Sequence, residues 1–301
     1  MKILLSILLY SILSLTSFAL SLPTIDDSAI RPIDAIPNVM YKDPKTGIIS
    51  CGIPPSAEPR VLFDPNHGLI AWYPLDGNAS DMSGNSHHGT IYGSIPTEDR
   101  HGKMNEAYNF DGIDDYIKIN HDKAFNHLPL SISAWFNTKG NSGQAGIVSK
   151  YWAAHWNGWQ IMDFDGDLVP WYLSSFSPRN VIIGKYGESK AFETKTPLDS
   201  WSHATVVFCE GGGTLFLNGK EADSMHWTGK ASAPTTIQPV TIGLYQGASN
   251  GYFKGSIDDV RIYNRALSAD EISLLYRAES PNHFVDSAKD LEMIWVEPGT
   301  F

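Results

Sequence analysis

Two adjacent acids near the end of the sequence are the first candidates for metal chemistry. Asp258 and Asp259 lie in residues 255–263, which have the alternation of a β-strand. Because successive side chains of a strand point to opposite faces, Asp258 is predicted to share a face with Val260 and Ile262. A carboxylate that points toward an apolar core needs a partner, and a metal ion can be that partner.

A second acidic segment, residues 76–85, has enough oxygen-bearing side chains close together in sequence to bind a calcium ion. Calcium takes six to eight oxygen ligands from carboxylates, amides, backbone carbonyls and water. The segment supplies four such side chains in ten residues: Asp76, Asn78, Asp81 and Asn85. The prediction is a structural Ca²⁺ site, and the alternative is a solvated turn rich in Asp, Asn and Gly that binds no metal.

Three alternating aspartates offer the one arrangement with a resemblance to hydrolase chemistry. On a continuous strand, Asp163, Asp165 and Asp167 would line one face, and paired carboxylates cleave glycosidic bonds. The Asp165-Gly166 step, however, is typical of a hairpin turn, which would break that face. No catalytic residue is therefore predicted, and a glycoside hydrolase is kept as an alternative.

Aromatic residues suggest a surface that could bind sugar. They cluster between residues 151 and 172, and Trp152 and Trp156 lie in its irregular part, residues 151–158. Exposed aromatic rings can stack on pyranose faces. We predict that these two tryptophans contact a glycan; the alternative is that the whole cluster fills a core.

The elements that would position these residues are almost all strands. Short apolar or alternating runs, separated by turn residues, predict an all-β fold: a two-sheet antiparallel jelly-roll sandwich. A capping box at Ser268 and Glu271 predicts one short C-terminal helix. The predicted strands are residues 69–73, 89–92, 107–110, 116–119, 130–138, 146–150, 159–164, 168–174, 181–185, 201–208, 214–217, 240–244 and 253–263.

The beginning of the chain indicates export. Residues 1–19 have the charged start, apolar run and small-residue cleavage site of a signal peptide, and residues 20–66 are a proline-rich linker. No second apolar run is long enough to span a membrane. Export would permit a disulfide between Cys51 and Cys209, although their separation leaves the pairing open. A formal charge of −11, without a basic cluster, argues against a nucleic-acid partner.

A series of motifs in residues 67–279 resembles the laminin-G-like jelly-roll family, of concanavalin A-like fold. The motifs lie at 68–78, 81–85, 109–117, 130–136, 201–207, 215–220 and 255–268. The resemblance implies a mostly non-catalytic module that binds glycan or glycoprotein. It also implies a calcium ligated first by Asp258 and Asp76, with Asn78, Asp81 and Asn85 as looser matches.

The end of the chain, residues 280–301, is predicted to be a linker and the possible start of a second domain. Its last eleven residues resemble the opening of the formylglycine-generating, sulfatase-modifying family. The sequence therefore predicts a recognition module that is secreted, periplasmic or on the cell surface. A structural spacer for a downstream domain is the remaining alternative.

Overall fold

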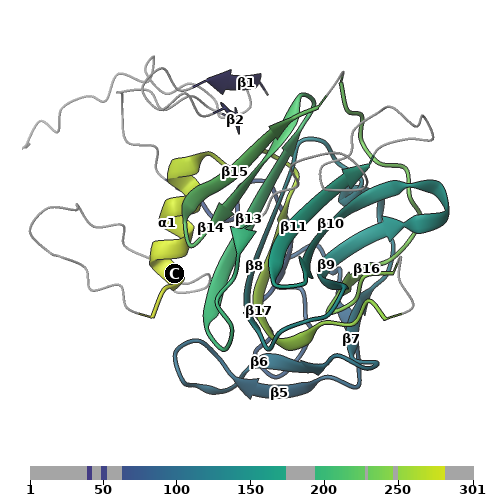
Figure 1. Cartoon of the computed structure of the whole chain (residues 1–301), viewed down its shortest axis with the longest axis vertical. Helices are drawn as coiled ribbons and strands as arrows, with labels where there is room; N and C mark the ends of the chain where they lie inside the picture. The colour runs from purple at the N-terminus through teal and green to yellow at the C-terminus, as the bar shows by residue number, and fades with distance from the viewer. Residues whose placement is uncertain are drawn as a thin grey trace, which may run out of the picture. The chain divides into compact units, whose positions relative to one another are not determined.

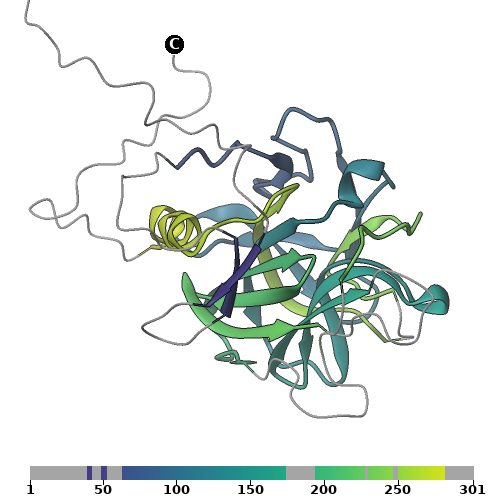
Figure 2. The same cartoon turned by 90° about the horizontal axis from the view of Figure 1, so that it is seen from above.

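The computed structural model describes residues 39–42, 49–52, 63–173, 194–227, 230–246 and 250–281, without the side chains of 39–42, 49–52, 152 and 153. These residues form two large antiparallel sheets (Figure 1, Figure 2) and a separate hairpin of β1 (Val39–Lys42) and β2 (Ile49–Gly52). The predicted jelly-roll sandwich is confirmed.

One sheet has seven strands. In spatial order they are β12 (Thr194–Lys195), β11 (Asp167–Leu173), β10 (Asn157–Phe164), β9 (Gln144–Trp152), β16 (Val240–Ile242), β7 (Tyr116–Ile119) and β4 (Gly89–Tyr92). Strand β4 is an edge of this sheet and β7 is the strand beside it, so both lie at the rim of the sheet.

The other sheet has eight strands, one of which, β3 (Leu69–Tyr73), pairs with β17 outside the main order. In spatial order they are β15 (Lys220–His226), β14 (Gly212–Leu217), β13 (Trp201–Cys209), β8 (Leu130–Thr138), β17 (Lys254–Tyr263), β6 (Met104–Asp111) and β5 (Ile95–Glu98), with β3 completing the set. Because β17 pairs with β3, β6 and β8, it joins the beginning and end of the domain.

The core lies between the two sheets. Trp159 and Tyr172 reach it from the seven-stranded sheet, and Phe136 and Phe208 from the eight-stranded sheet. The rings of Tyr172 and Phe208 are 5.1 Å apart across the interface. Each fully buried side chain of this size stabilises the fold by about 1.5–3 kcal/mol, so the two sheets hold each other in place.

The predicted helix is α1 (Ala269–Glu279), and it begins with the predicted capping box. Ser268 Oγ accepts a hydrogen bond from Glu271 N at 3.2 Å, and Glu271 Oε2 accepts one from Ser268 N at 2.8 Å. Ile272 packs with Val207 and Phe216 of the eight-stranded sheet. The helix therefore covers part of the outer face of that sheet (Figure 2).

Two predicted turns are confirmed by their backbone angles. Asn218 and Gly219 have φ values of 51° and 72° between β14 and β15, and Asp165 and Gly166 have 52° and 84° between β10 and β11. Positive φ at both central residues matches the twist of a two-residue hairpin. Cys209 is disulfide-bonded, and the sequence contains one other cysteine, Cys51.

Several predictions fall outside the described residues. They are the signal peptide (1–19), the linker (20–66) apart from the β1–β2 hairpin and residues 63–66, the strand at 181–185 and the possible second domain within 282–301. Strands β5 and β15 were not predicted, because their mixed polar sequences lack a clear apolar alternation. Among the described residues, no helix is long and apolar enough to cross a bilayer.

Candidate functional site

A β-bulge in β17 decides where the two adjacent acids point. The register of β17 against β8 shifts between Asp258 and Arg261, and Asp259 has a φ of 44°. A bulge adds one residue to a strand, so the alternation of faces slips by one position. The predicted sharing of a face by Asp258, Val260 and Ile262 is therefore wrong. Residues that line the core are Ile257, Val260 and Ile262.

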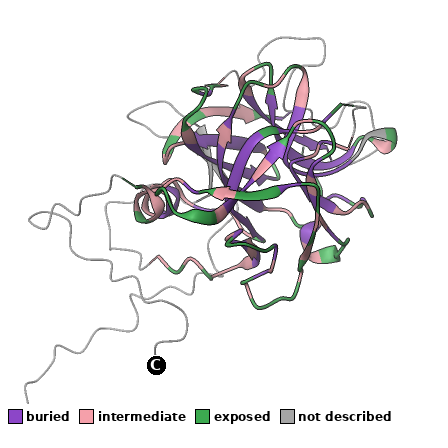
Figure 3. Cartoon of the chain, turned by 90° about the horizontal axis from the view of Figure 1, so that it is seen from below, coloured by how far each residue is buried: buried purple, intermediate pink, exposed green. Residues whose placement is uncertain are grey.

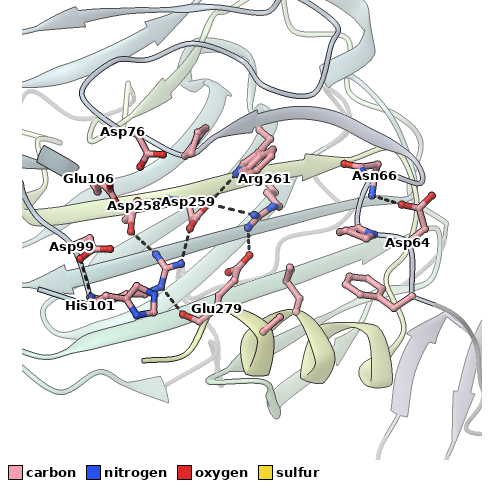
Figure 4. A pocket seen from close by; sticks show the side chains of 17 residues that line it. Asp64, Asn66, Asp76, Asp99, His101, Glu106, Asp258, Asp259, Arg261 and Glu279 are labelled. Atoms are coloured by element: carbon pink, nitrogen blue, oxygen red, sulfur yellow. Dashed lines mark hydrogen bonds and ion pairs between the residues drawn. The ribbon is translucent and has the colours of Figure 1, made fainter. Parts of the chain in front are cut away.

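Asp258, Asp259 and Arg261 instead line a pocket of about 530 Å³ beside α1 (Figure 4). Its apolar walls include Trp72 of β3 and Leu275 of α1. We call this hollow the acidic pocket, because carboxylates outnumber cationic side chains in its lining. The carboxylates are Asp64, Asp76, Asp99, Glu106, Asp258, Asp259 and Glu279, and the arginines are Arg100 and Arg261.

Arg100, in the turn between β5 and β6, joins three separate groups at the floor of the acidic pocket. Its Nη1 donates to the Asp258 carboxylate, and its Nη2 donates to Asp259 Oδ2 at 2.7 Å. Its Nε donates to the backbone oxygen of Glu279 at 2.7 Å. The guanidinium also lies 4.8 Å from the centre of the Trp135 ring, in cation–π geometry.

Arg261 extends this network to the side chain of Glu279. Its Nη1 donates to Glu279 Oε1, and its Nη2 lies 3.3 Å from Asp259 Oδ1. Two indole nitrogens complete the set: Trp72 Nε1 donates to Asp259 Oδ1 at 2.8 Å, and Trp135 Nε1 donates to Glu279 Oε2 at 2.7 Å. Strand β17 is thus connected to β3 and to α1 by charge-assisted hydrogen bonds.

The two adjacent acids have opposite pKa shifts. Burial works to raise the pKa of Asp259, but the charges of Arg261 and Arg100 outweigh it and lower the pKa. Burial, together with the negative charge of Asp259, raises the pKa of Asp258 to about 9. The network contains three carboxyl groups and two guanidinium groups, and Asp258 is the carboxyl that more readily binds a proton.

Three of the five predicted calcium ligands are used to shape the loop between β3 and β4. Asp81 Oδ1 accepts from Trp72 N at 3.0 Å and from Ser83 N at 2.9 Å, and its Oδ2 accepts from His87 N at 2.9 Å. Burial alone would raise its pKa, but these hydrogen bonds lower it. Asn78 Oδ1 accepts from Ser80 N at 2.8 Å, and Asn85 Nδ2 donates to Ile70 O at 2.9 Å.

The other two predicted ligands, Asp76 and Asp258, both reach the acidic pocket. Burial and the charges of Glu106 and Asp259 raise the pKa of Asp76. No described residue donates a hydrogen bond to the Asp76 carboxylate, whereas Asp258 is held by Arg100. The five residues as arranged do not fit one calcium ion, because they are dispersed and one is paired with a guanidinium. Calcium binding stays a prediction.

A tighter carboxylate group lies elsewhere, in the turn between β6 and β7. Within the described part of the chain, one set of three acids, histidines or cysteines brings its ligand atoms within 4.8 Å of one another. Asp111 Oδ1 in this set accepts from Ile113 N at 2.7 Å, and Asp115 Oδ2 accepts from Asp111 N at 2.9 Å. The set is Asp111, Asp114 and Asp115.

The three aspartates of the hydrolase hypothesis do not share a strand face. The Asp163 side chain is buried and accepts hydrogen bonds from Thr138 Oγ1 at 2.6 Å and Gly166 N at 2.8 Å. Asp165 occupies the predicted hairpin turn, and Asp167 pairs with Lys195 at 2.7 Å on the next strand. All three carboxylates support the local structure.

Exposed aromatic residues provide a second candidate surface. Trp156 is 48% exposed, whereas the side chain of Trp152 is not described. Sequence reasoning missed a row of tyrosines on the outer face of the seven-stranded sheet. Tyr92 of β4 is 41% exposed and stacks on Tyr116 of β7, with ring centres 4.6 Å apart and planes 7° apart.

This tyrosine row has a third member, Tyr252, whose ring centre lies 6.4 Å from that of Tyr116. Tyr92 and Tyr116 pair across strands directly, and the neighbouring pair Ile91 and Ile117 points toward the core side. The strand alternation of residues 89–92 and 116–119 was therefore the available signal, since it places both tyrosines on the outward face. Figure 3 colours the described residues by how far each is buried.

Comparison with known proteins agrees with this architecture. Residues 111–273, more than half of the chain, match the family model described as the concanavalin A-like lectin/glucanases superfamily. The chain belongs to this family. The resemblance drawn from the sequence motifs is thus confirmed for the concanavalin A-like fold. No curated protein matches the chain in sequence.

Solved structures of concanavalin A-like fold are similar at low identity. Domain 4 of an arabinanase from Geobacillus stearothermophilus, in complex with arabinotriose, has a TM-score of 0.54 and 22% identity, over 69% of this chain and 98% of that one. The binding domain of Paraclostridial Mosquitocidal Protein 1 has a TM-score of 0.56 and 20% identity, over 70% of this chain and 52% of that one. The binding domain of Botulinum Neurotoxin DC, in complex with SialylT, has a TM-score of 0.50 and 16% identity, over 71% of this chain and 52% of that one. The chain thus spans about half the length of the toxin domains.

Proposed function

We propose that this concanavalin A-like chain is a non-catalytic module that binds carbohydrate through the tyrosine row. The observation that carries the proposal is the open, stacked pair of Tyr92 and Tyr116 at the rim of the seven-stranded sheet. Tyr92 lies on the edge strand β4, so the face of its ring that is turned away from Tyr116 can stack on the apolar face of a sugar ring, and the tyrosine hydroxyls can hydrogen-bond.

Polar neighbours on the same strands suit a sugar ligand. Thr90 and Lys118 pair directly across β4 and β7, two residues from Tyr92 and Tyr116, so they share the outward face. A hydroxyl and an ammonium group can bond to sugar hydroxyls, and Lys118 would also favour an acidic sugar. Two of the similar structures are complexes with arabinotriose and with SialylT, which supports a sugar ligand for this fold.

The wider setting of the proposal is an exported recognition protein whose partner is a glycan or a glycoprotein. The signal-peptide pattern of residues 1–19 and the excess of acidic residues support export and make nucleic acid an unsuitable partner. The disulfide at Cys209 is also consistent with an oxidising compartment. The structural calcium that the sequence analysis expects is not part of this proposal, because its five predicted ligands as arranged do not fit one ion; the response of the melting temperature to a chelator tests that expectation separately.

The test is a binding screen of the full chain against neutral and sialylated oligosaccharides, followed by titration calorimetry. For the best ligand, Tyr92→Ala and Tyr116→Ala are each expected to weaken affinity about tenfold, the effect of losing one aromatic contact. Ile95→Ala is the matched control, because Ile95 is 62% exposed but lies on the other sheet.

Trp156→Ala, made in parallel, tells the two candidate surfaces apart. Loss of affinity in Trp156→Ala, with both tyrosine variants unchanged, would move the site to the β9–β10 hairpin that the sequence analysis favoured. Unchanged affinity in all three variants would refute stacking of the sugar on Tyr92, Tyr116 or Trp156. A folded sample that binds no sugar would favour the spacer hypothesis.

A further inference from the structure

Arg100 occupies the place where the sequence predicts a metal ion. The acid that is best matched to a calcium ligand is Asp258, and its Oδ2 receives the Arg100 Nη1 donor. Its Oδ1 accepts from Asp259 N at 2.8 Å, so both oxygens of this carboxylate have partners. Asp259 likewise uses Oδ2 for Arg100 and Oδ1 for Trp72 and Arg261.

The guanidinium is built into this position from several sides. The Arg100 side chain is 6% exposed and donates through Nε, Nη1 and Nη2. The flat fork of an arginine suits two neighbouring carboxylates, and the group stays charged at any pH at which the fold exists. The Trp135 ring closes one side of the guanidinium.

A divalent cation at the same place would be repelled by the Arg100 guanidinium. An ion that bound Asp258 and Asp259 together would stand against the positive guanidinium at short range, inside a poorly hydrated site. Calcium also needs six or more oxygen ligands, whereas the oxygens of these two carboxylates are already bonded. The ion would have to displace Arg100 and break three hydrogen bonds.

We propose that Arg100 is the resident cation of this site and performs the joining role that the sequence assigns to calcium. Through Asp258 and Asp259 it holds β17, and through the backbone oxygen of Glu279 it holds the end of α1. These partners lie 158, 159 and 179 residues away along the chain. The stability of the fold therefore depends on Arg100 and is independent of calcium.

The test compares thermal unfolding of the full chain with chelator and with about 1 mM calcium, the weak end of the range for extracellular calcium modules. The unaltered chain is expected to melt at one temperature in both conditions. Arg100→Ala is expected to lower the melting temperature by about 10 °C in chelator, because it leaves buried carboxylates unpaired. Added calcium is expected to restore part of that loss, since Asp258 and Asp259 then lack the guanidinium and their carboxylates can bind the ion.

A matched control removes a cation from the same turn. Lys103 pairs with Glu106 and has a 68% exposed side chain, so Lys103→Ala should shift the melt little and should not respond to calcium. Arg100→Lys keeps the charge but has no fork to bridge two carboxylates. It is expected to melt between the unaltered chain and Arg100→Ala.

Two results would overturn the proposal. One is a fall in the melting temperature of the unaltered chain on chelation; the other is an Arg100→Ala variant that melts like the unaltered chain, or that calcium does not stabilise. Calorimetric titration of calcium into the unaltered chain decides the case in which Arg100→Ala does not fold. A binding heat that disappears in Asp258→Asn contradicts the proposal, and the absence of such a heat supports it.

Discussion

Asp81 provides the sharpest test of whether the acidic loop before β4 binds metal or is held by hydrogen bonds. Its carboxylate is fully buried and accepts from three backbone N–H groups, those of Trp72, Ser83 and His87, at 2.9–3.0 Å. Asp81→Ala removes the acceptor for all three donors. Asp81→Asn keeps Oδ1 for two of them but places an NH₂ group against His87 N.

The size of each effect follows from those contacts. A hydrogen bond to a charged group contributes about 1.5–3 kcal/mol, and a buried donor left without a partner costs about 1–3 kcal/mol. Asp81→Asn disrupts one bond and is expected to destabilise the fold by about 2–3 kcal/mol. Asp81→Ala leaves three donors unsatisfied and is expected to cost about 3–6 kcal/mol, unless water enters the space.

The assay is chemical unfolding of both variants, in chelator and in calcium, with Asp76→Asn as the control. Asp76 is equally a predicted calcium ligand, but no described residue donates a hydrogen bond to its carboxylate. The hydrogen-bond account therefore predicts that Asp76→Asn has little effect and that calcium changes none of the three results. Equal losses at Asp76 and Asp81 that appear only with calcium present would refute it.

The same carboxylate predicts a pH dependence. Hydrogen bonds lower the pKa of Asp81 below its ordinary value of 3.8, against the opposing effect of burial. A carboxyl group with a lowered pKa in the folded state binds fewer protons there than in the unfolded state. Its contribution is therefore present above pH 3.8 and is lost as the pH falls through the folded-state pKa. Asp81→Asn should flatten the acid limb of stability against pH.

Two further predictions concern the bulged strand and one tight turn. Asp258→Asn should cost less stability than Asp259→Asn. The pKa of Asp258 is raised, so this residue gains little from ionisation, whereas the charges of two arginines lower the pKa of Asp259. Equal losses of stability in urea unfolding would contradict this order. Gly158→Ala should prevent folding, because a Cβ at this position would lie 2.0 Å from Lys150 O. A Cβ at Gly84 would have no atom within 4 Å, so Gly84→Ala should cost only the roughly 1–2 kcal/mol of a residue in the left-handed conformation. Soluble expression and circular dichroism compare the two glycine variants, and a well-folded Gly158→Ala protein would show that the hairpin can shift.

Most of the fold was predictable because its signals are local. Alternation of apolar residues placed nine of the strands with at least one boundary correct, for example Leu69–Tyr73 and Leu130–Thr138. Asn218 and Gly219 predicted a hairpin because few other residues adopt positive φ at both positions. Ser268 and Glu271 predicted the start of α1 because each satisfies a backbone N–H of the other.

The candidate site was predicted only in outline. Asp76 and Asp258 both line the acidic pocket, whereas calcium ligation by them stays a prediction. The alternation rule failed at Asp258, because a bulge depends on how β17 aligns with β8 and is not written in the strand pattern itself. Trp156 is exposed as expected, although its role in sugar binding stays a prediction.

By itself, the sequence determined the class of fold, its tight turns, its capped helix and the acidic character of the chain, since each depends on residues close together along the backbone. The tertiary structure decided which charges meet. Arg100 lies more than 150 residues from Asp258, Asp259 and Glu279, and nothing in the residues around it indicates those partners. Their contact arises because β17, the last strand, pairs with β6 and β8 from much earlier in the chain, and this register brings the Arg100 guanidinium to the buried acids.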